Sequence, residues 1–170
     1  MTSTAAQAAP AIDTENTLYM QLKDGRVVIE LRPDLAPEHV KRIKELTRKG
    51  FYDGLKFHRV IDGFMAQTGD PRGDGTGGSD LPDLKAEFSS AKHVRGTASM
   101  ARAGDPDSAN SQFFICFKPA PFLDGQYTIW GQVVEGMEFV DNITRGDEAN
   151  NGAVANPDVI VSMKVAADVK

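Results

Sequence analysis

The amino-acid sequence predicts a mainly β fold in which an antiparallel barrel is closed by helices. Several short strand-like segments follow one another, each bounded by Gly, Pro, Asp or Asn, and such spacing is typical of barrels and sandwiches. Two segments have helical periodicity, and helices and strands do not alternate strictly along the chain. This order argues against a parallel sheet built from βαβ units.

A β-hairpin is predicted near the N-terminus. Apolar and polar residues alternate from Leu18 to Leu31, on both sides of the dipeptide Asp24-Gly25. A period of two is typical of a strand, and Asp-Gly is a preferred two-residue hairpin turn. We therefore expect two antiparallel strands joined at residues 24–25.

The first helix is predicted from Pro37 to Lys49. Pro33 and Pro37 end the preceding strand, and Gly50 follows the last helical residue, in agreement with the usual boundaries of helices. The apolar residues that recur at helical spacing are Val40, Ile43 and Leu46. His39 is expected on the solvated side of this helix.

The remaining elements are short strands and one short helix. Residues 57–67 have a strand-like pattern interrupted by Asp62-Gly63, and a loop dense in Gly, Asp and Pro follows at 69–83. A long loop in a compact domain is more often functional than accidental. Further elements are expected as strands at 96–101, 111–117, 128–134 and 159–165, a helix at 136–144 and a polar surface loop at 147–156.

Length and composition favour a single globular domain. The chain has 170 residues, of which 41% are hydrophobic and 25% charged, and this is enough to build a sizeable core. Residues 1–14 are expected to form a flexible tail, because the N-terminus lacks the basic start and apolar run of a signal peptide. Residues 15–170 are expected to form the domain.

Charge and cysteine content narrow the choice of partners and compartment. The net charge of -5 argues against a nucleic-acid partner, which requires a basic face. No segment approaches the ~20 apolar residues that span a bilayer, so no membrane partner is expected. Cys116 is the only cysteine, which excludes an internal disulfide and fits a cytoplasmic location.

The sequence lacks motifs for covalent, metal or phosphate chemistry. It contains no G-x-S-x-G nucleophile elbow and no pair of histidines with the spacing of a helical zinc site. Residues 105–116 begin like a calcium loop but have Asn110 and Cys116 where glycine and glutamate are required. No lysine follows the glycines of residues 73–78. We expect no metal and no cofactor, and we expect His58 to be a hydrogen-bonded core histidine.

The strand-like pattern before and after Asp62-Gly63 leaves one arginine among apolar residues. Alternation puts Arg59 on the face opposite its two neighbours, while Gln67 shares a face with Met65 and Gln112 shares one with Phe114. If these faces converge, they form an apolar surface with an arginine and two amides. Otherwise the arginine is a surface charge and the aromatic residues belong to the core. The pattern alone leaves both alternatives open.

At these residues the chain resembles a cyclophilin. The matching motifs follow in consistent order between about Leu18 and Val165 and are Phe57-His58-Arg59-Val60-Ile61, Gly63-Phe64-Met65 with Gln67, Gly75-Thr76-Gly77-Gly78, Ser99-Met100-Ala101, Ser111-Gln112-Phe113-Phe114-Ile115 and Phe122-Leu123-Asp124-Gly125. The resemblance implies an eight-stranded antiparallel barrel capped by two helices, with a peptide groove on its outer surface. It also implies peptidyl-prolyl cis-trans isomerase activity on proline-containing peptides and on unfolded or partly folded proteins.

The resemblance further implies roles for individual residues. Arg59 would be the catalytic arginine, and Gln67 would hydrogen-bond the peptide backbone. Ala101 and Arg102 would lie along the groove floor, where the main chain of Arg102 meets the residue before proline, and Gln112 would support the groove. The proline pocket would be lined by Phe64, Met65, Phe114 and Leu123. Phe122 and Tyr127 complete the implied substrate-binding set, and Gly75 and Thr76 form the implied groove edge.

Three positions depart from the commonest eukaryotic pattern of this family. Phe122 stands where tryptophan is frequent, Tyr127 where histidine is frequent and Arg102 where asparagine is frequent, and these changes resemble the bacterial branch. Because Phe122 lacks an indole N–H donor for cyclosporin, we predict weak cyclosporin binding with catalysis retained. A monomer is expected. The main alternative is a binding module or holdase that uses the same groove, with isomerisation incidental.

Overall fold

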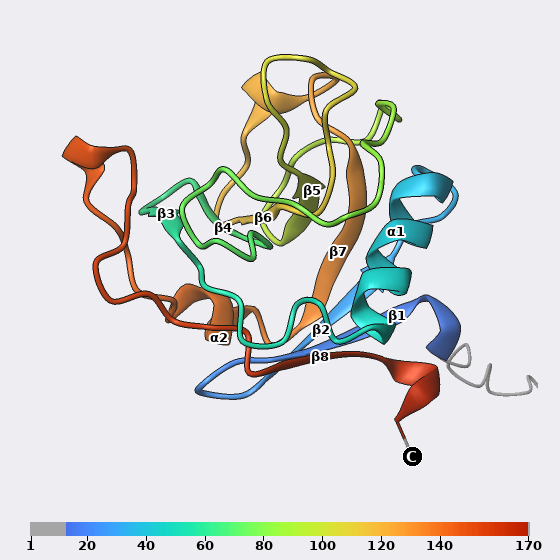
Figure 1. The fold of residues 1–170 in the computed structure, drawn as a ribbon, viewed down its shortest axis with the longest axis horizontal. Coiled ribbons are helices and arrows are strands. Elements are labelled where there is room, and N and C mark those ends of the chain that lie inside the picture. Colours follow the sequence, from blue (N-terminus) through green and yellow to red (C-terminus); the bar gives the residue numbers. More distant parts are fainter. Residues whose placement is uncertain (1–12, 170) are drawn as a thin grey trace, which may run out of the picture.

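The computed structural model describes residues 13–169, and within this range it contains strands, two α-helices and four 3-10 helices (Figure 1). The strands are β1 (Thr17–Gln21), β2 (Arg26–Leu31), β3 (Arg59–Ile61), β4 (Met65–Thr68), β5 (Thr97–Met100), β6 (Phe113–Cys116), β7 (Ile129–Glu135) and β8 (Ser162–Val165). The helices are α1 (Pro37–Arg48), α2 (Met137–Asp141), η1 (Thr14–Asn16), η2 (Pro121–Leu123), η3 (Glu148–Asn150) and η4 (Ala166–Asp168). Most of the predicted N-terminal tail, residues 1–12, lies outside the described residues.

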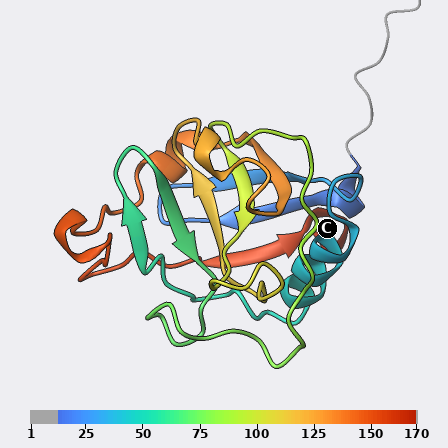
Figure 2. The same cartoon turned by 90° about the horizontal axis from the view of Figure 1, so that it is seen from above.

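The eight strands form one antiparallel sheet in the order β3-β4-β6-β5-β7-β2-β1-β8. Figure 2 shows the curl of this sheet. The edge strands of this sheet are β3 and β8. The segments that precede them in the chain are hydrogen-bonded to each other: Phe57 N donates to Asp158 O at 2.8 Å, and Ile160 N donates to Leu55 O at 2.9 Å. The predicted mainly β fold of eight antiparallel strands and two helices is confirmed.

Helix α1 begins at Pro37 as predicted and packs against β7 and β8. The apolar stripe of Val40, Ile43 and Leu46 is buried. The placement of His39 on the solvated side was wrong, because its side chain is fully buried under Glu87, which belongs to the long loop before β5.

Glu87 also caps the N-terminus of helix α1. One of its carboxylate oxygens accepts the main-chain N–H of His39 at 2.8 Å, and Ala36 at the N-cap has no side chain that could accept it. A free N–H at a helix start needs such a partner. The loop therefore completes the helix from outside, which no pattern within the helix could predict.

Several predicted boundaries shift in the structure. In the hairpin, Leu22 N donates to Gly25 O at 2.9 Å, so the turn is centred on residues 23–24, one residue before the predicted dipeptide. Helix α2 ends at Asp141, earlier than the predicted residue 144. Strand β8 begins at Ser162, because residues 158–160 bind residues 54–57 before the chain joins the sheet. No helix within residues 13–169 has the length and hydropathy required to cross a membrane.

Strand β6 is buried on both faces. Phe113 and Ile115 point into the main core, where the Phe113 ring packs edge-on against Trp130 at a centroid distance of 5.2 Å. The alternate residues Phe114 and Cys116 point to the opposite face, as a strand with a period of two requires. This opposite face carries a second apolar cluster on the outside of the curled sheet.

Candidate active site

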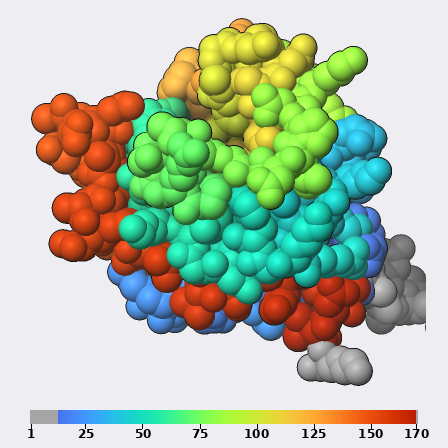
Figure 3. Space-filling view, viewed as in Figure 1, coloured from blue at the N-terminus to red at the C-terminus, as the bar shows by residue number. Residues whose placement is uncertain are grey.

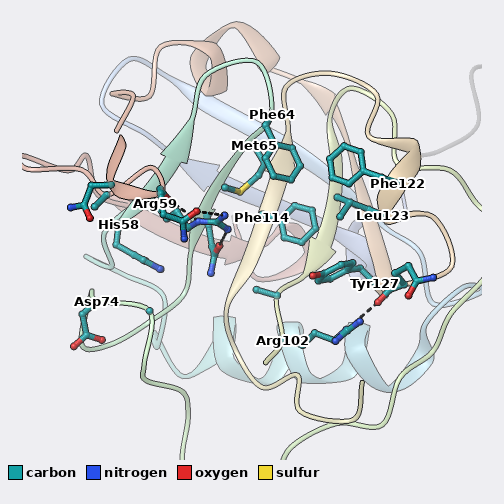
Figure 4. A pocket seen from close by; sticks show the side chains of 17 residues that line it. His58, Arg59, Phe64, Met65, Asp74, Arg102, Phe114, Phe122, Leu123 and Tyr127 are labelled. Carbon is teal, nitrogen blue, oxygen red and sulfur yellow. Dashed lines mark hydrogen bonds between the residues drawn. The ribbon is translucent and has the colours of Figure 1, made fainter. Parts of the chain in front are cut away.

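The second apolar cluster forms the floor of an open hollow of about 970 Å³ (Figure 4). The predicted site residues that line it are Arg59, Phe64, Met65, Gln67, Gly75, Ala101, Arg102, Phe114, Phe122, Leu123 and Tyr127. The predicted residues Thr76 and Gln112 line an adjoining hollow of about 450 Å³. Four residues line both hollows, namely Gln67, Gly75, Ala101 and Arg102. The structure thus brings all the predicted site residues to one surface.

Strand register aligns the central residues. Arg59 on β3 is the cross-strand partner of Gln67 on β4, and Gln67 is the partner of Phe114 on β6. Directly opposed residues on adjacent strands point to the same face. Of the two alternatives left open by the pattern, the converging faces are therefore the correct one.

A chain of side-chain hydrogen bonds runs across the hollow. Nη1 of Arg59 donates to Oε1 of Gln67 at 3.0 Å, and Nε2 of Gln67 donates to Oε1 of Gln112 at 2.9 Å. Nε2 of Gln112 donates in turn to the carbonyl oxygens of Gly75 at 3.0 Å and Gly77 at 2.9 Å. The glycine loop is thereby tied to the arginine through two amides.

Aromatic and aliphatic side chains form the floor and one wall of the hollow. Met65, Phe114 and Leu123 are buried in the second cluster. Phe122 is 68% exposed, and its ring lies 5.3 Å from the ring of Phe64, with the two planes tilted by 50°. An aromatic pair with one exposed ring, beside a buried apolar floor, can receive a small apolar ring.

His93 supports the floor from behind. It is buried, and its ring stacks on Phe114 at a centroid distance of 6.2 Å. Its Nδ1 lies 3.0 Å from Oδ1 of Asp124, and its Nε2 lies 2.9 Å from Oγ of Ser99. Partners on both ring nitrogens fix the orientation of the imidazole and hence the surface on which Phe114 rests.

Arg102 forms the wall opposite Arg59, beside Tyr127 (Figure 4). Its guanidinium lies 4.6 Å from the centroid of the Tyr127 ring, and its Nε donates to the carbonyl oxygen of Gln126 at 3.0 Å. Within residues 13–169, the main-chain N–H and C=O of Arg102 have no hydrogen-bond partner. An extended peptide could bind to this free backbone edge.

Arg59 is only partly exposed, and this changes its electrostatics. Burial lowers the pKa of Arg59 from its ordinary value, because a low-dielectric environment disfavours the charged guanidinium. Arginine nevertheless remains a cation in proteins. The hollow therefore contains a permanent cationic hydrogen-bond donor above an apolar floor.

His58 is buried as predicted, but its expected hydrogen bonds are absent. Neither ring nitrogen has a partner within the described part of the chain, and the side chain lines the hollow. Burial lowers the pKa of His58, because a low-dielectric environment disfavours the charged imidazolium.

Sequence reasoning missed further residues that line the hollow. They are His58, Asp74, Gln126, Asn150, Asn151 and Ala153. The last three belong to the loop after α2, which was predicted only as a polar surface loop. The dipeptide Asn151-Gly152 is a strong signal for a tight turn, and this signal could have marked the loop as ordered.

No three His, Cys, Asp or Glu side chains gather within residues 13–169 in a way that could hold a metal ion. The other titratable residues in the lining are His58, Asp74, Arg102 and Tyr127. The arrangement is that of a peptide-binding hollow in which the partly buried Arg59 faces an apolar floor.

Sequence comparisons identify relatives over most of the chain. The family model described as cyclophilin type peptidyl-prolyl cis-trans isomerase/CLD matches residues 17–165. A probable peptidyl-prolyl cis-trans isomerase from Brucella suis biovar 1 (strain 1330) is 58% identical, with 98% of this chain and 90% of the relative covered. Peptidyl-prolyl cis-trans isomerase B from Bacillus subtilis (strain 168) is 45% identical, with 77% of this chain and 92% of the relative covered.

Solved structures agree with the sequence relatives. A cyclophilin from Hirschia baltica superposes with a TM-score of 0.83 at 30% identity, covering 93% of this chain and 76% of the other. A cyclophilin type isomerase from Cryptosporidium parvum, solved in the presence of the dipeptide Ala-Pro, superposes with a TM-score of 0.80 at 29% identity and covers 88% of this chain and 98% of the other. The chain thus belongs to the cyclophilin-type peptidyl-prolyl cis-trans isomerases, enzymes that interconvert the cis and trans forms of X-Pro peptide bonds.

Proposed function

We propose that isomerisation takes place in the hollow around Arg59, where the proline ring lies on Met65, Phe114 and Leu123 and the peptide backbone binds Gln67 and Arg102. The observation that carries this proposal is the cationic side chain of Arg59 held at the edge of an apolar floor. The solved relative with Ala-Pro is consistent with a proline-sized ligand in this family.

The chemistry requires only that the enzyme prefer a twisted amide. Rotation about the X-Pro bond loses amide resonance and has an uncatalysed barrier of about 18–20 kcal/mol. As resonance is lost, the prolyl nitrogen becomes pyramidal and gains a lone pair. The Arg59 guanidinium can donate to that lone pair, which the planar ground state does not offer.

A contact made only at the twisted state lowers the barrier directly. Each ~1.4 kcal/mol of extra stabilisation speeds the step about tenfold, and a fixed cationic donor in a partly apolar site is a strong stabiliser. The apolar floor holds the proline ring still while the acyl part of the bond turns.

Peptide binding along Arg102 follows from its free backbone edge. Gln67 has a donor and an acceptor at the same rim, and Gln112 keeps its amide in place. We place the residue before proline beside the main chain of Arg102, between the two adjoining hollows. The glycine loop at Gly75 and Thr76 would then border the side chains further from the proline.

A monomer as the active unit stays a prediction. Weak binding of cyclosporin, assistance to folding of unfolded or partly folded proteins, and a cytoplasmic location stay predictions. A holdase role can be tested separately in an aggregation assay, because a holdase would keep its protective effect in an Arg59→Ala variant while a folding helper that depends on isomerisation would lose it.

The proposal is tested with purified protein and an X-Pro peptide by NMR exchange between the cis and trans forms. Wild-type protein should accelerate exchange, and a folded Arg59→Ala variant should lose most of this acceleration. Unchanged exchange in the variant would refute the role of Arg59.

A further inference from the structure

The Arg59 guanidinium has a second anchor besides Gln67. Its Nε donates to the main-chain oxygen of Asn151 at 3.0 Å, and its Nη2 donates to Oδ1 of the same residue at 3.2 Å. Asn151 therefore binds one edge of the planar guanidinium with two oxygens, and Gln67 binds Nη1. Of the five N–H donors of an arginine, these contacts use three and leave one on each terminal nitrogen.

All three acceptors are neutral amide oxygens. Within residues 13–169 no Asp or Glu lies within ion-pair distance of Arg59, whereas Arg95 forms a two-pronged pair with Asp141. A carboxylate would hold a guanidinium at least as firmly. The acceptors around Arg59 fix its plane without neutralising its charge.

The loop after α2 delivers Asn151 to this position, and it does so by pairing with the free edge of β3. Val60 N donates to Gly152 O at 2.8 Å, Gly146 N donates to Val60 O at 2.8 Å, and Val154 N donates to His58 O at 3.1 Å. In Figure 3 the loop is part of the red group that projects on the side of β3. The loop after α2 thus covers the edge of strand β3, and the same loop carries Asn151, which binds the Arg59 guanidinium.

A tight turn fixes the backbone of Asn151. Asn151 has φ of 55° and Gly152 has φ of 84°, and Ala153 N donates to Asn150 O at 3.1 Å across them. Two successive positive φ angles are typical of a type I′ turn, in which Asn-Gly is the preferred pair. Asparagine tolerates this conformation better than other residues with a side chain.

We propose that Asn151 is a positioning residue for the isomerase reaction, which holds the Arg59 guanidinium through neutral oxygens and leaves its charge free for the twisted amide. The inference rests on the proposed role of Arg59 at the prolyl nitrogen. The inference adds that Asn151 must be uncharged, as well as correctly placed, for Arg59 to act on the substrate.

The physical reason is the difference between a hydrogen bond and an ion pair. A carboxylate at the same place would keep the geometry but would attract the guanidinium protons and cancel much of its field at the substrate. The carboxylate would stabilise the guanidinium already in the free enzyme. The guanidinium would then stabilise the twisted amide less, and the barrier to rotation would be higher.

The decisive variant is Asn151→Asp, which keeps the shape and the turn and adds one negative charge. We expect kcat to fall about tenfold or more with little change in KM, because the contact affected is made in the transition state. The NMR resonance of the Arg59 Nε–H should persist, since the guanidinium stays anchored. The matched control is Asn156→Asp, which adds the same charge to an exposed residue of the same loop outside the hollow and should retain the wild-type kcat.

A second variant separates the side-chain contact from the turn. Asn151→Gly keeps the main-chain acceptor and suits a positive φ, so its thermal stability should be unchanged. Loss of Oδ1 should lower kcat about two- to fivefold. A glycine variant with the full wild-type kcat would show that Asn151 serves only the turn.

The outcomes distinguish this inference from the proposed function. If Asn151→Asp retains the wild-type kcat, or if Asn156→Asp loses as much as Asn151→Asp, the inference fails while the role of Arg59 stands on its own variant. If Arg59→Ala retains wild-type turnover, the proposed function itself fails. Should the aspartate variant not fold, the glycine variant still decides.

Discussion

Oε1 of Gln67 lies 3.0 Å from Nη1 of Arg59, and this contact lies opposite the edge that Asn151 binds. A planar guanidinium can bind both neighbours at once, whereas a lysine ammonium is a flexible point charge. We predict that Arg59→Lys keeps the charge but loses about ten- to a hundredfold in kcat, as NMR exchange on an X-Pro peptide would show. Arg26→Lys is the matched control, because Arg26 stacks on Tyr19 outside the hollow. A kcat of Arg59→Lys within about twofold of wild type would show that charge alone suffices.

The exposed ring of Phe122 predicts how the protein treats cyclosporin. Phe122 lies at the rim of the hollow beside Phe64 and carries no polar atom that could donate to a ligand. We expect Phe122→Trp to tighten cyclosporin binding about tenfold, the effect of one added hydrogen bond of ~1.4 kcal/mol, with prolyl isomerisation little changed. Calorimetric titration with cyclosporin measures the dissociation constants of the wild type and of the variant. A dissociation constant of the wild type already in the low nanomolar range would defeat this prediction.

Part of the site follows from local pattern and part requires register. Alternation with a period of two shows that Met65 and Gln67 share a face of their strand, and that Gln112 and Phe114 share a face of theirs. It does not reveal that Gln67 faces Phe114 across β4 and β6. Register depends on contacts between distant segments, so only the resemblance to a family supplied it.

The errors have the same physical origin. His39 was assigned to the solvated side because the apolar stripe of its own helix lies elsewhere, and the carboxylate that covers it comes from Glu87, 48 residues later. Asn151 was missed because its partner Arg59 lies 92 residues earlier. The periodicity of a segment shows which of its residues share a face. It does not show which distant loop packs against that face.

The contact between buried His39 and half-buried Glu87 predicts a pH dependence of stability. Nδ1 of His39 lies 2.6 Å from the Glu87 carboxylate, while its Nε2 is buried without a partner. A second proton would therefore leave an unpaired N–H in the core, and burial lowers the pKa of His39. The unfolded chain binds that proton more readily, so the contribution of His39 to stability is present above about pH 6.5 and declines as the pH falls toward the pKa of the folded protein.

His39→Asn tests this dependence. At about pH 7.5 the variant should lose about 1–3 kcal/mol of unfolding free energy through lost packing and a weakened contact with Glu87. The difference from wild type should be smaller at about pH 5.5, because the wild type has then lost part of the histidine contribution. Urea titrations of both proteins at the two pH values measure this difference in unfolding free energy. A difference that grows at the lower pH would mean that the folded protein holds His39 as a cation paired with Glu87.

Gly77 predicts how tightly the glycine loop beside the hollow is packed. A Cβ at this position would lie 2.1 Å from Oδ1 of Asp70, a buried carboxylate that accepts the main-chain N–H groups of Arg72, Asp74 and Gly75. Gly77→Ala should therefore lower the unfolding free energy by about 1–3 kcal/mol. It should also lower kcat/KM, since the carbonyl of Gly77 binds the Gln112 amide. Gly104→Ala, with no atom within 4 Å of its added Cβ, should change stability by less than about 0.5 kcal/mol. Equal losses in the two variants would show that the carboxylate yields to the methyl group and that the loop is not held by Asp70.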